Sequence, residues 1–311
     1  MTAAIVLNPT HGAVGTIFLV TGTGFQAAAD TITFTFAGVS ISANEGTITD
    51  DGAGNFTAHI TAPAGLVGSV QGAHAVVATD AHTNSGSANF TIDPKLVLSP
   101  TTGNVGDSDT ITLTGYAASS AITVSFGATS CTPVSGTTDA HGALTTTYTV
   151  PAATADSVSG AHTVTVADAS ANTANAPYTI TPKVVISPLF GNTGVTVTAT
   201  LSGYAATSAL TATFNGVSVS LSAGTTDAHG VLAPTFTVPT KGGLDGANTV
   251  SIHDAVPNTA TTTFELYLAA SGISMNSTFT HLNGRNLYIK PTTTSREREA
   301  IVNITFDATD E

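Results

Sequence analysis

The chain has 311 residues, enough for about two to four domains that each bury a core. Only 9% of residues are charged and the net charge is −13, so we expect no nucleic-acid partner, because phosphates would go unneutralised. No apolar run reaches the roughly 18 residues that a transmembrane helix needs, so we expect no membrane span despite a mean hydropathy of +0.27.

The same pattern occurs three times along the chain. Each copy opens with a Pro-x-x-Gly-x-x-Gly turn, followed by a Gly-aromatic pair and a strand of alternating apolar residues. The opening residues are Pro9, Pro100 and Pro188. The strands after the Gly-aromatic pairs are predicted at 31–36, 121–126 and 209–214.

The second half of each copy holds a turn from Asp to Gly, a strand that ends at Pro, and a Gly-Ala-His or Gly-Ala-Asn block. Each copy thus contains about seven short strands separated by turn residues, which is typical of an immunoglobulin-like sandwich. The predicted fold class is all-β, with three tandem immunoglobulin-like β-sandwiches plus a short C-terminal β segment. The predicted ranges are 1–94, 95–182 and 183–266 for the repeats, and 267–311 for the C-terminal segment.

The C-terminal segment does not match the repeat, although strands are predicted in it at 273–280, 286–290 and 299–306. Four of the chain's seven Lys and Arg residues lie there. The segment is either a small β domain or a source of strands that complete a neighbouring subunit's sheet. We expect it to act in assembly or docking.

The repeats resemble the bacterial and archaeal Ig-like repeats of IPT/TIG type that occur in secreted surface proteins. The residues that carry this resemblance are the opening turn, Gly-Phe/Tyr-Ala-x-x-Ser, Thr-x-Asp-Ala-His-Gly, and Gly-Ala-His-Thr-Val-x-Val-x-Asp. The first repeat departs from it at Asp51-Gly-Ala-Gly54, where the His is missing, and at Gly24-Phe25, which lacks the Ala-x-x-Ser spacing. The resemblance implies the sandwich fold and a surface-protein context, but such modules serve as stalks, adhesins, surface-layer units and virion decorations alike.

No catalytic constellation stands out, and we predict that the chain is not an enzyme and has no catalytic residues. The His residues fall mainly at equivalent places in the repeats, which favours a structural role over a metal or catalytic one. No Gly-x-Ser-x-Gly elbow follows a strand and opens a helix. We therefore expect no certain cofactor.

Calcium is the one cofactor that the acidic residues suggest, because hard cations prefer clustered oxygen ligands. No EF-hand spacing is present, and the alternative is that these acids are solvated turn residues. The candidate ligands are Asp51, Asp107, Asp109, Asp139 and Asp227, with the strand-end residues Asp80, Asp168 and Asp254 as further oxygen donors.

Four Asn-x-Ser/Thr sequons permit N-glycosylation if the chain is secreted in a competent host. In a Thr-rich sequence several sequons arise by chance. The four acceptor residues are Asn55, Asn89, Asn276 and Asn303.

The leading hypothesis is a structural subunit of an extracellular assembly, either a pilus-like surface filament or a surface layer. Copies of the same chain would be the main partners, joined by β-strand pairing through residues 2–7 or part of 273–306. The charge-poor Thr/Ser surface suggests burial against neighbouring subunits or glycosylation, and both point to a location outside the cytoplasm. The alternative is an adhesin, or a virion fibre or decoration protein, that binds a receptor, a glycan or another cell-surface component.

Overall fold

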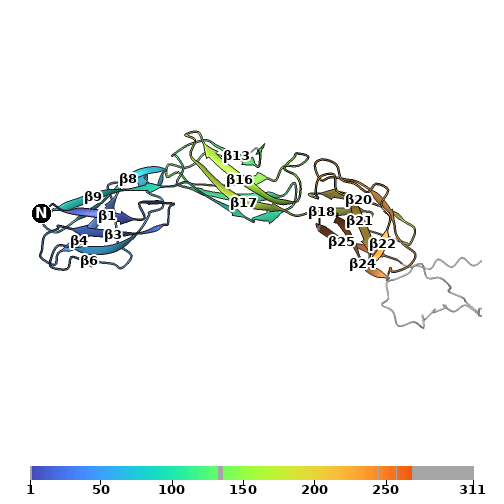
Figure 1. The fold of residues 1–311 in the computed structure, drawn as a ribbon, viewed down its shortest axis with the longest axis horizontal. Helices are drawn as coiled ribbons and strands as arrows, with labels where there is room; N and C mark the ends of the chain where they lie inside the picture. Colours follow the sequence, from blue (N-terminus) through green and yellow to red (C-terminus); the bar gives the residue numbers. More distant parts are fainter. Residues whose placement is uncertain (1, 132–135, 244, 257, 268–311) are drawn as a thin grey trace, which may run out of the picture. The chain divides into compact units, whose positions relative to one another are not determined.

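The computed structural model describes residues 2–131, 136–243, 245–256 and 258–267, and Figure 1 shows them as three β-sandwiches in chain order. The predicted all-β fold with tandem immunoglobulin-like sandwiches is confirmed for these ranges. The strands predicted at 273–280, 286–290 and 299–306 lie outside the described residues. In the part of the chain that is described, no helix has the length and apolar character to cross a membrane.

Each sandwich packs a three-stranded antiparallel sheet against a larger sheet. In sandwich 1 the smaller sheet contains β1 (Ala4–Asn8), β3 (Ile17–Thr23) and β7 (Phe56–Thr61). The larger sheet contains β2 (His11–Gly12), β9 (Ser85–Ile92), β8 (Gly72–Thr79), β4 (Thr31–Phe36) and β5 (Val39–Ile41), with β6 (Ile48–Thr49) beside β4. A single 3-10 turn, η1, spans Val67–Ser69.

Sandwiches 2 and 3 repeat this strand order. In sandwich 2 the smaller sheet contains β10 (Lys95–Ser99), β12 (Ser108–Thr114) and β15 (Leu144–Thr149). Its larger sheet contains β11 (Thr102–Gly103), β17 (Thr173–Ile180), β16 (Gly160–Asp168), β13 (Ile122–Phe126) and β14 (Thr129–Cys131).

In sandwich 3 the smaller sheet contains β18 (Lys183–Ser187), β20 (Thr196–Ser202) and β23 (Thr235–Thr237). The larger sheet contains β19 (Phe190–Gly191), β25 (Thr259–Leu266), β24 (Gly246–Asp254), β21 (Leu210–Phe214) and β22 (Val217–Val219). The two-residue strands β2, β11 and β19 each pair in parallel with the last strand of their own sandwich.

The core of each sandwich follows from the period-two alternation of its strands. In β3, for example, Phe18 and Val20 are buried while Thr21 lies on the outer side. Phe and Tyr supply most of the buried volume, at about 1.5 to 3 kcal/mol for each fully buried large side chain. The buried aromatic residues of sandwich 1 are all Phe, whereas sandwich 2 has Tyr116, Phe126, Tyr148 and Tyr178, and sandwich 3 has Tyr204, Phe214, Phe236 and Phe264.

In each repeat, a backbone hydrogen bond joins the Gly-aromatic pair to the turn that runs from Asp to Gly. The backbone N–H of Tyr116, in the Gly-aromatic pair, donates to the carbonyl of Gly142 at 3.1 Å, and Gly142 adopts a φ of 70°. A Cβ on Gly142 would lie 2.0 Å from the Tyr116 carbonyl oxygen, so only glycine fits. The same hydrogen bond links Phe25 to Gly54 and Tyr204 to Gly230. This contact explains why the Gly-aromatic pair and the glycine of the later turn recur together in the sequence.

Candidate functional site

Three of the five predicted calcium ligands are carboxylates that close their own turns. Asp139 Oδ1 accepts from the backbone N–H groups of His141 at 2.8 Å and Ala143 at 2.9 Å. Asp227 and Asp51 do the same in the equivalent turns. The hydrogen bond from Ala143 holds the pKa of Asp139 below its usual value. These carboxylates have a structural role that needs no metal.

Asp107 and Asp109 lie at the start of β12, and their surroundings differ. Asp107 is half-exposed and accepts from the backbone N–H of Asn104 at 2.8 Å. Asp109 is buried on the inner face, where its carboxylate accepts a hydrogen bond from the Tyr178 hydroxyl. Burial raises the pKa of Asp109, and the negative charge of Asp107 raises it further.

The polar character of this core extends to two neighbouring side chains. The Tyr148 hydroxyl is buried and has no hydrogen-bond partner among the described residues. Burial raises the pKa of Tyr148, and the charge of Asp109 adds to the effect. Burial likewise raises the pKa of the half-buried Cys131 thiol. The core of sandwich 2 thus contains ionisable groups with perturbed pKa values.

The predicted calcium ligands do not converge. Across 2–131, 136–243, 245–256 and 258–267, no group of three or more His, Cys, Asp or Glu side chains is placed to hold a metal ion. Calcium binding by Asp51, Asp107, Asp109, Asp139 and Asp227 stays a prediction.

In all three sandwiches, the aspartate at the end of a strand is buried and accepts hydrogen bonds from a distant backbone N–H and from a nearby Asn side chain. In sandwich 2, Asp168 accepts from the backbone N–H of Ala117 at 2.8 Å and from the side chain of Asn172 at 2.8 Å. Burial acts to raise the pKa of Asp168, but these hydrogen bonds outweigh it and hold the pKa below its usual value. Asp80 and Asp254 make the equivalent contacts in sandwiches 1 and 3.

Two of the four predicted glycosylation sites lie in the described residues, both in sandwich 1. Asn55 and Asn89 are exposed, so their side chains are accessible to a modifying enzyme. The Asn55 amide donates to Asp51 at 3.1 Å, which would have to break on modification. Asn276 and Asn303 lie outside the described residues. N-glycosylation stays a prediction at all four.

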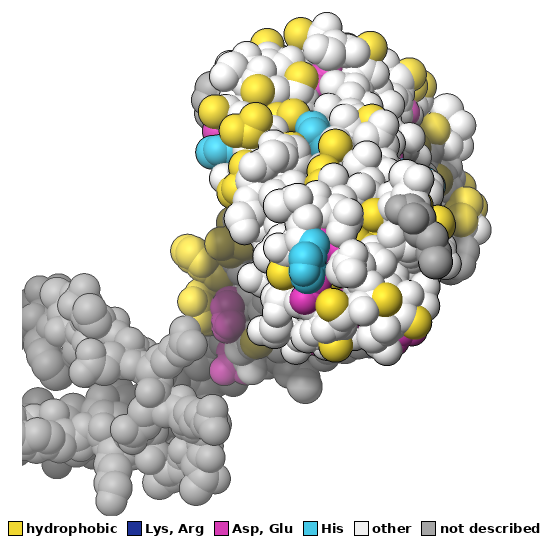
Figure 2. Space-filling view, turned by 90° about the vertical axis from the view of Figure 1, so that its left-hand side faces the viewer, with side chains coloured by type: hydrophobic (Ala, Val, Ile, Leu, Met, Phe, Trp, Pro, Cys, Tyr) yellow, Lys and Arg dark blue, Asp and Glu magenta, His cyan; other side chains and the backbone are white. Residues whose placement is uncertain are grey.

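The outer faces of the sheets carry threonine where most proteins carry charge. In sandwich 2, Thr110 lies opposite Thr147 and Thr112 opposite Thr145 on the outer side of β12 and β15. In the smaller sheet of sandwich 3, Thr198–Thr235 is equivalent to Thr110–Thr147 and Thr196–Thr237 is a further pair, and the larger sheet has Thr249–Thr263. Figure 2 shows one face of the molecule, on which neutral polar side chains and backbone dominate and no Lys or Arg is visible.

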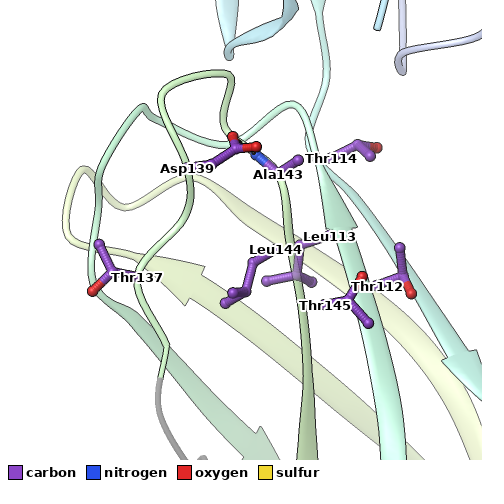
Figure 3. Close-up of a pocket in the computed structure, with 8 residues that line it drawn as sticks. All are labelled: Thr112, Leu113, Thr114, Thr137, Asp139, Ala143, Leu144 and Thr145. Atoms are coloured by element: carbon purple, nitrogen blue, oxygen red, sulfur yellow. Dashed lines mark hydrogen bonds between the residues drawn. The ribbon is translucent and has the colours of Figure 1, made fainter. Parts of the chain in front are cut away.

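A hollow of about 400 Å³ opens on this threonine face in sandwich 2 (Figure 3). Thr112 and Thr145 lie side by side at one end of it, and Asp139 lies at the other end next to Ala143. The lining contains one carboxylate, threonine hydroxyls and the side chains of Leu113 and Leu144. It pairs no nucleophile with a base, which an acyl-transfer site would require.

Two aromatic side chains of sandwich 3 differ from all others in the described ranges, where every other Phe and Tyr is buried. Phe190 in β19 is 58% exposed and Tyr267 after β25 is 39% exposed. Their ring centroids lie 5.9 Å apart at an interplanar angle of 53°. The one signal in the sequence for Phe190 is its place in the opening turn of the third repeat, where the other two repeats have His11 and Thr102.

Comparison with known proteins gives fold likeness only. No family model matches the sequence, so the IPT/TIG assignment stays a prediction. No curated protein matches it either.

Several solved structures of tandem domains are similar to the chain at low identity. The adhesin InvE of Yersinia pseudotuberculosis is 18% identical over 58% of this chain and 58% of its own, with a TM-score of 0.27. A Bacteroides ovatus glucan-utilisation protein, SGBP-B, solved with a mixed-linkage heptasaccharide, is 14% identical over 84% of this chain and 65% of its own, with a TM-score of 0.29. The titin I9–I11 tandem is 12% identical over 86% of this chain and 100% of its own, with a TM-score of 0.21.

The chain spans less than two thirds of the length of the first two of these proteins. Identities and TM-scores this low add no evidence on function. The fold assignment rests on the chain's own strand order and register.

Proposed function

We propose that the protein is a structural subunit of an extracellular assembly, a surface filament or a surface layer, in which copies join by β-strand pairing. The observation that carries the proposal is the neutral hydroxyl surface of the sheets, with Thr pairs such as Thr112–Thr145 on their outer faces. Charged residues normally keep a free monomer apart from its copies. A surface without them lets copies approach closely without repulsion or costly desolvation of charge.

Open sheet edges supply the means of joining. In the described residues β1 forms a ladder with β3 alone, and its other edge lies beside β9 of the larger sheet without forming a ladder with it. The equivalent edge strands β10 and β18 are alike. Each of these strands also has an exposed apolar residue at its centre: Val6 at 67%, Val97 at 45% and Val185 at 51%. Exposed apolar edge strands favour association.

The N-terminal strand suits an exchange between subunits. Ile5 and Leu7 of β1 fill the core of their own sandwich. If β1 crosses to the next subunit, the same side chains fill the same space there, so no core contact is lost. If each subunit gives β1 to the next one and receives β1 from the one before, the contact is head-to-tail and builds a filament wherever the rotation between subunits does not close a ring. The alternative route, through 273–306, involves residues outside those described.

A reversible lock on β1 tests this mechanism. Val6 and Thr21 are register partners on β1 and β3, so Val6→Cys with Thr21→Cys, in a Cys131→Ser background, ties β1 to its own sandwich when oxidised. We expect the oxidised protein to sediment as a monomer, and the reduced protein to polymerise like the parent. Cys131→Ser alone is the matched control and should polymerise under both conditions.

Other outcomes would each correct a different part of the proposal. Equal polymerisation of the oxidised and reduced forms would exclude exchange of β1, and deletion of 267–311 would then test the C-terminal route. Polymerisation that survives both changes would exclude exchange of either terminal segment and would leave pairing through the edges of β1, β10 and β18. A parent protein that stays monomeric at every concentration would exclude the structural-subunit role itself.

A further inference from the structure

One end of sandwich 3 departs from the other two sandwiches at three structurally equivalent positions. In β19 and β25, Phe190 is the register partner of Glu265, and Tyr267 N–H donates to the Gly191 carbonyl at 2.9 Å. The matching register pairs are His11–Thr91 in sandwich 1 and Thr102–Thr179 in sandwich 2. The residues equivalent to Tyr267, which donate to Gly12 and Gly103, are Asp93 and Thr181.

The fold itself does not require aromatic residues there. In sandwich 1 the same place holds a polar pair, with His11 Nδ1 2.6 Å from Asp93 Oδ2, and in sandwich 2 it holds Thr102 and Thr181. An aromatic ring that is 58% exposed gains little from burial in its own domain. Exposed aromatic residues that gather at one place indicate a binding surface.

Phe190, Glu265 and Tyr267 project from the same side of the larger sheet. Register partners share a face, and residues two apart on a strand do so as well. The next strand places Ala247 opposite Glu265 and Thr249 opposite Thr263 on this face. The small Ala247 side chain leaves room beside the Glu265 carboxylate, and the threonines continue the surface with hydroxyl groups.

The Glu265 carboxylate is available to a ligand. In the described part of the chain, the Glu265 side chain takes part in no hydrogen bond and no ion pair. A free carboxylate accepts strong hydrogen bonds from hydroxyl groups. It also repels an anionic ligand, which limits the choice of partner to neutral or cationic groups.

We propose that Phe190, Glu265 and Tyr267 form a binding site for a neutral oligosaccharide. A pyranose ring has an apolar C–H face that packs on aromatic rings and hydroxyl groups that donate to a carboxylate. The two tilted rings of Phe190 and Tyr267 provide the apolar platform, and Glu265 fixes the orientation of the sugar. Thr249 and Thr263 extend the site along the sheet for further sugar units. A single cationic group would use the rings and the carboxylate but would leave this hydroxyl-lined extension without a role.

This inference goes beyond the structural role and does not rest on it. The experiment is a screen of the full chain against a printed array of neutral gluco-, manno-, galacto- and xylo-oligosaccharides that range from single sugars to longer oligomers. Arrays carrying choline and an arginine-rich peptide provide the cationic comparison. Binding of a neutral oligosaccharide is then measured by titration calorimetry.

The decisive variant gives sandwich 3 the residues of sandwich 2: Phe190→Thr with Tyr267→Thr. Because Thr102 and Thr181 occupy these positions in a folded sandwich, the substitution should leave the fold intact. We expect sugar affinity to fall at least about tenfold, the loss that accompanies removal of stacked aromatic contacts. Glu265→Gln should weaken binding severalfold, while Val185→Thr, which removes an exposed apolar side chain from the other sheet of the same sandwich, should leave it unchanged.

Three results would overturn the proposal. The first is absence of binding to every neutral oligosaccharide, including the case in which the parent binds only choline or the arginine-rich peptide. The second is unchanged affinity in the Phe190→Thr/Tyr267→Thr variant. The third is an equal loss in Val185→Thr. If the double variant unfolds at a lower temperature than the parent, Glu265→Gln decides, and unchanged sugar affinity in that variant contradicts the proposal.

Discussion

Sandwiches 1 and 2 share their strand order but differ in the core. Phe18 of β3 stacks on Phe90 of β9, with ring centroids 4.4 Å apart. At the equivalent positions sandwich 2 has Asp109 and Tyr178, which are joined by a hydrogen bond. An apolar contact in one sandwich is therefore an ionisable pair in the other.

Sandwiches 2 and 3 differ less on the outer face of the smaller sheet than in the core. Sandwiches 2 and 3 differ at the core position of Asp109, where sandwich 3 has Val197, yet both carry paired threonines on the outer side of the same two strands. The interior tolerates chemical change as long as the volume is filled and polar groups are paired. Sandwich 1 keeps one of the equivalent threonine pairs, Thr21–Thr57, and has Leu19–His59 in place of the other.

The largest expected effect comes from giving sandwich 1 the residue of sandwich 2. Phe18→Asp removes the stack on Phe90 and buries a carboxyl group that Phe90 cannot hydrogen-bond. We expect sandwich 1 to lose about 4 kcal/mol of stability. Amide hydrogen exchange, followed peptide by peptide, measures the loss separately in each sandwich. A change below about 1 kcal/mol would show that the position tolerates charge in any sandwich.

A similar but smaller loss is expected at a feature that all sandwiches share. Asp168→Ala leaves the backbone N–H of Ala117 and the side chain of Asn172 without their acceptor. We expect sandwich 2 to lose about 3 kcal/mol, with the exchange of sandwiches 1 and 3 unaffected. Asp168→Asn, which keeps one oxygen acceptor, should recover part of the loss. Equal stability of the Ala variant and the parent would mean that the hydrogen bonds of Asp168 do not stabilise the sandwich.

The reverse transfer should stabilise sandwich 2. Asp109→Val with Tyr178→Phe installs the residues found in sandwich 3, Val197 and Phe264, and removes a buried polar pair. Replacement of such a pair by well-packed apolar groups is expected to raise stability by about 1 to 2 kcal/mol. Asp109→Val alone should give less, because it leaves the Tyr178 hydroxyl buried without an acceptor. A less stable double variant would show that the polar pair stabilises this core.

The smallest effect concerns pH. Because burial raises the pKa of Asp109, its contribution to stability is fully present below 3.8, the ordinary value for aspartate, and is lost as the pH rises through its folded pKa. The groups facing it add no opposing charge: Asp107 is acidic, and Tyr178, Tyr148 and Cys131 have raised pKa values.

The ionisation of Asp168 changes stability in the opposite direction and over a lower range of pH. Its pKa is lowered, so its contribution is present above 3.8 and lost as the pH falls through its folded pKa. Hydrogen exchange from about pH 4 to about pH 7, corrected for intrinsic exchange rates, should therefore show sandwich 2 losing stability with rising pH. The Asp109→Val/Tyr178→Phe variant should lack this slope. A slope that persists in the variant would place its origin elsewhere.

The fold could be predicted from the sequence because the residues that define each repeated turn are required by the local backbone conformation. Gly142 and Gly230 occupy positions that admit no side chain, and the strand predicted at 31–36 is β4. The histidines at equivalent positions are structural: His74 and His162 each contact a backbone carbonyl four residues earlier, at 2.8 Å. These features depend on local spacing, which a single sequence contains.

The sites were harder to predict because they depend on which face a residue occupies. Asp109 is close in sequence to Asp107, which suggested an exposed calcium ligand. It lies two residues before Ile111 and four before Leu113, however, so it shares their buried face of β12. Phe190 stands within a turn motif, where its exposure and its contact with Tyr267, 77 residues later in the sequence, follow only from the parallel pairing of β19 with β25. A contact between residues so far apart in the sequence can be predicted only when the pairing of the strands is known.

Electron microscopy of the purified full chain, across a range of concentrations, tests the assembly role most directly. The neutral threonine faces and open edges predict filaments or sheets with a regular repeat. Thr112→Lys with Thr145→Lys should reduce their number by placing paired charges on one face, while Thr112→Ser with Thr145→Ser should not. Isolated single particles at every concentration, with no difference between these variants and the parent, would contradict the account.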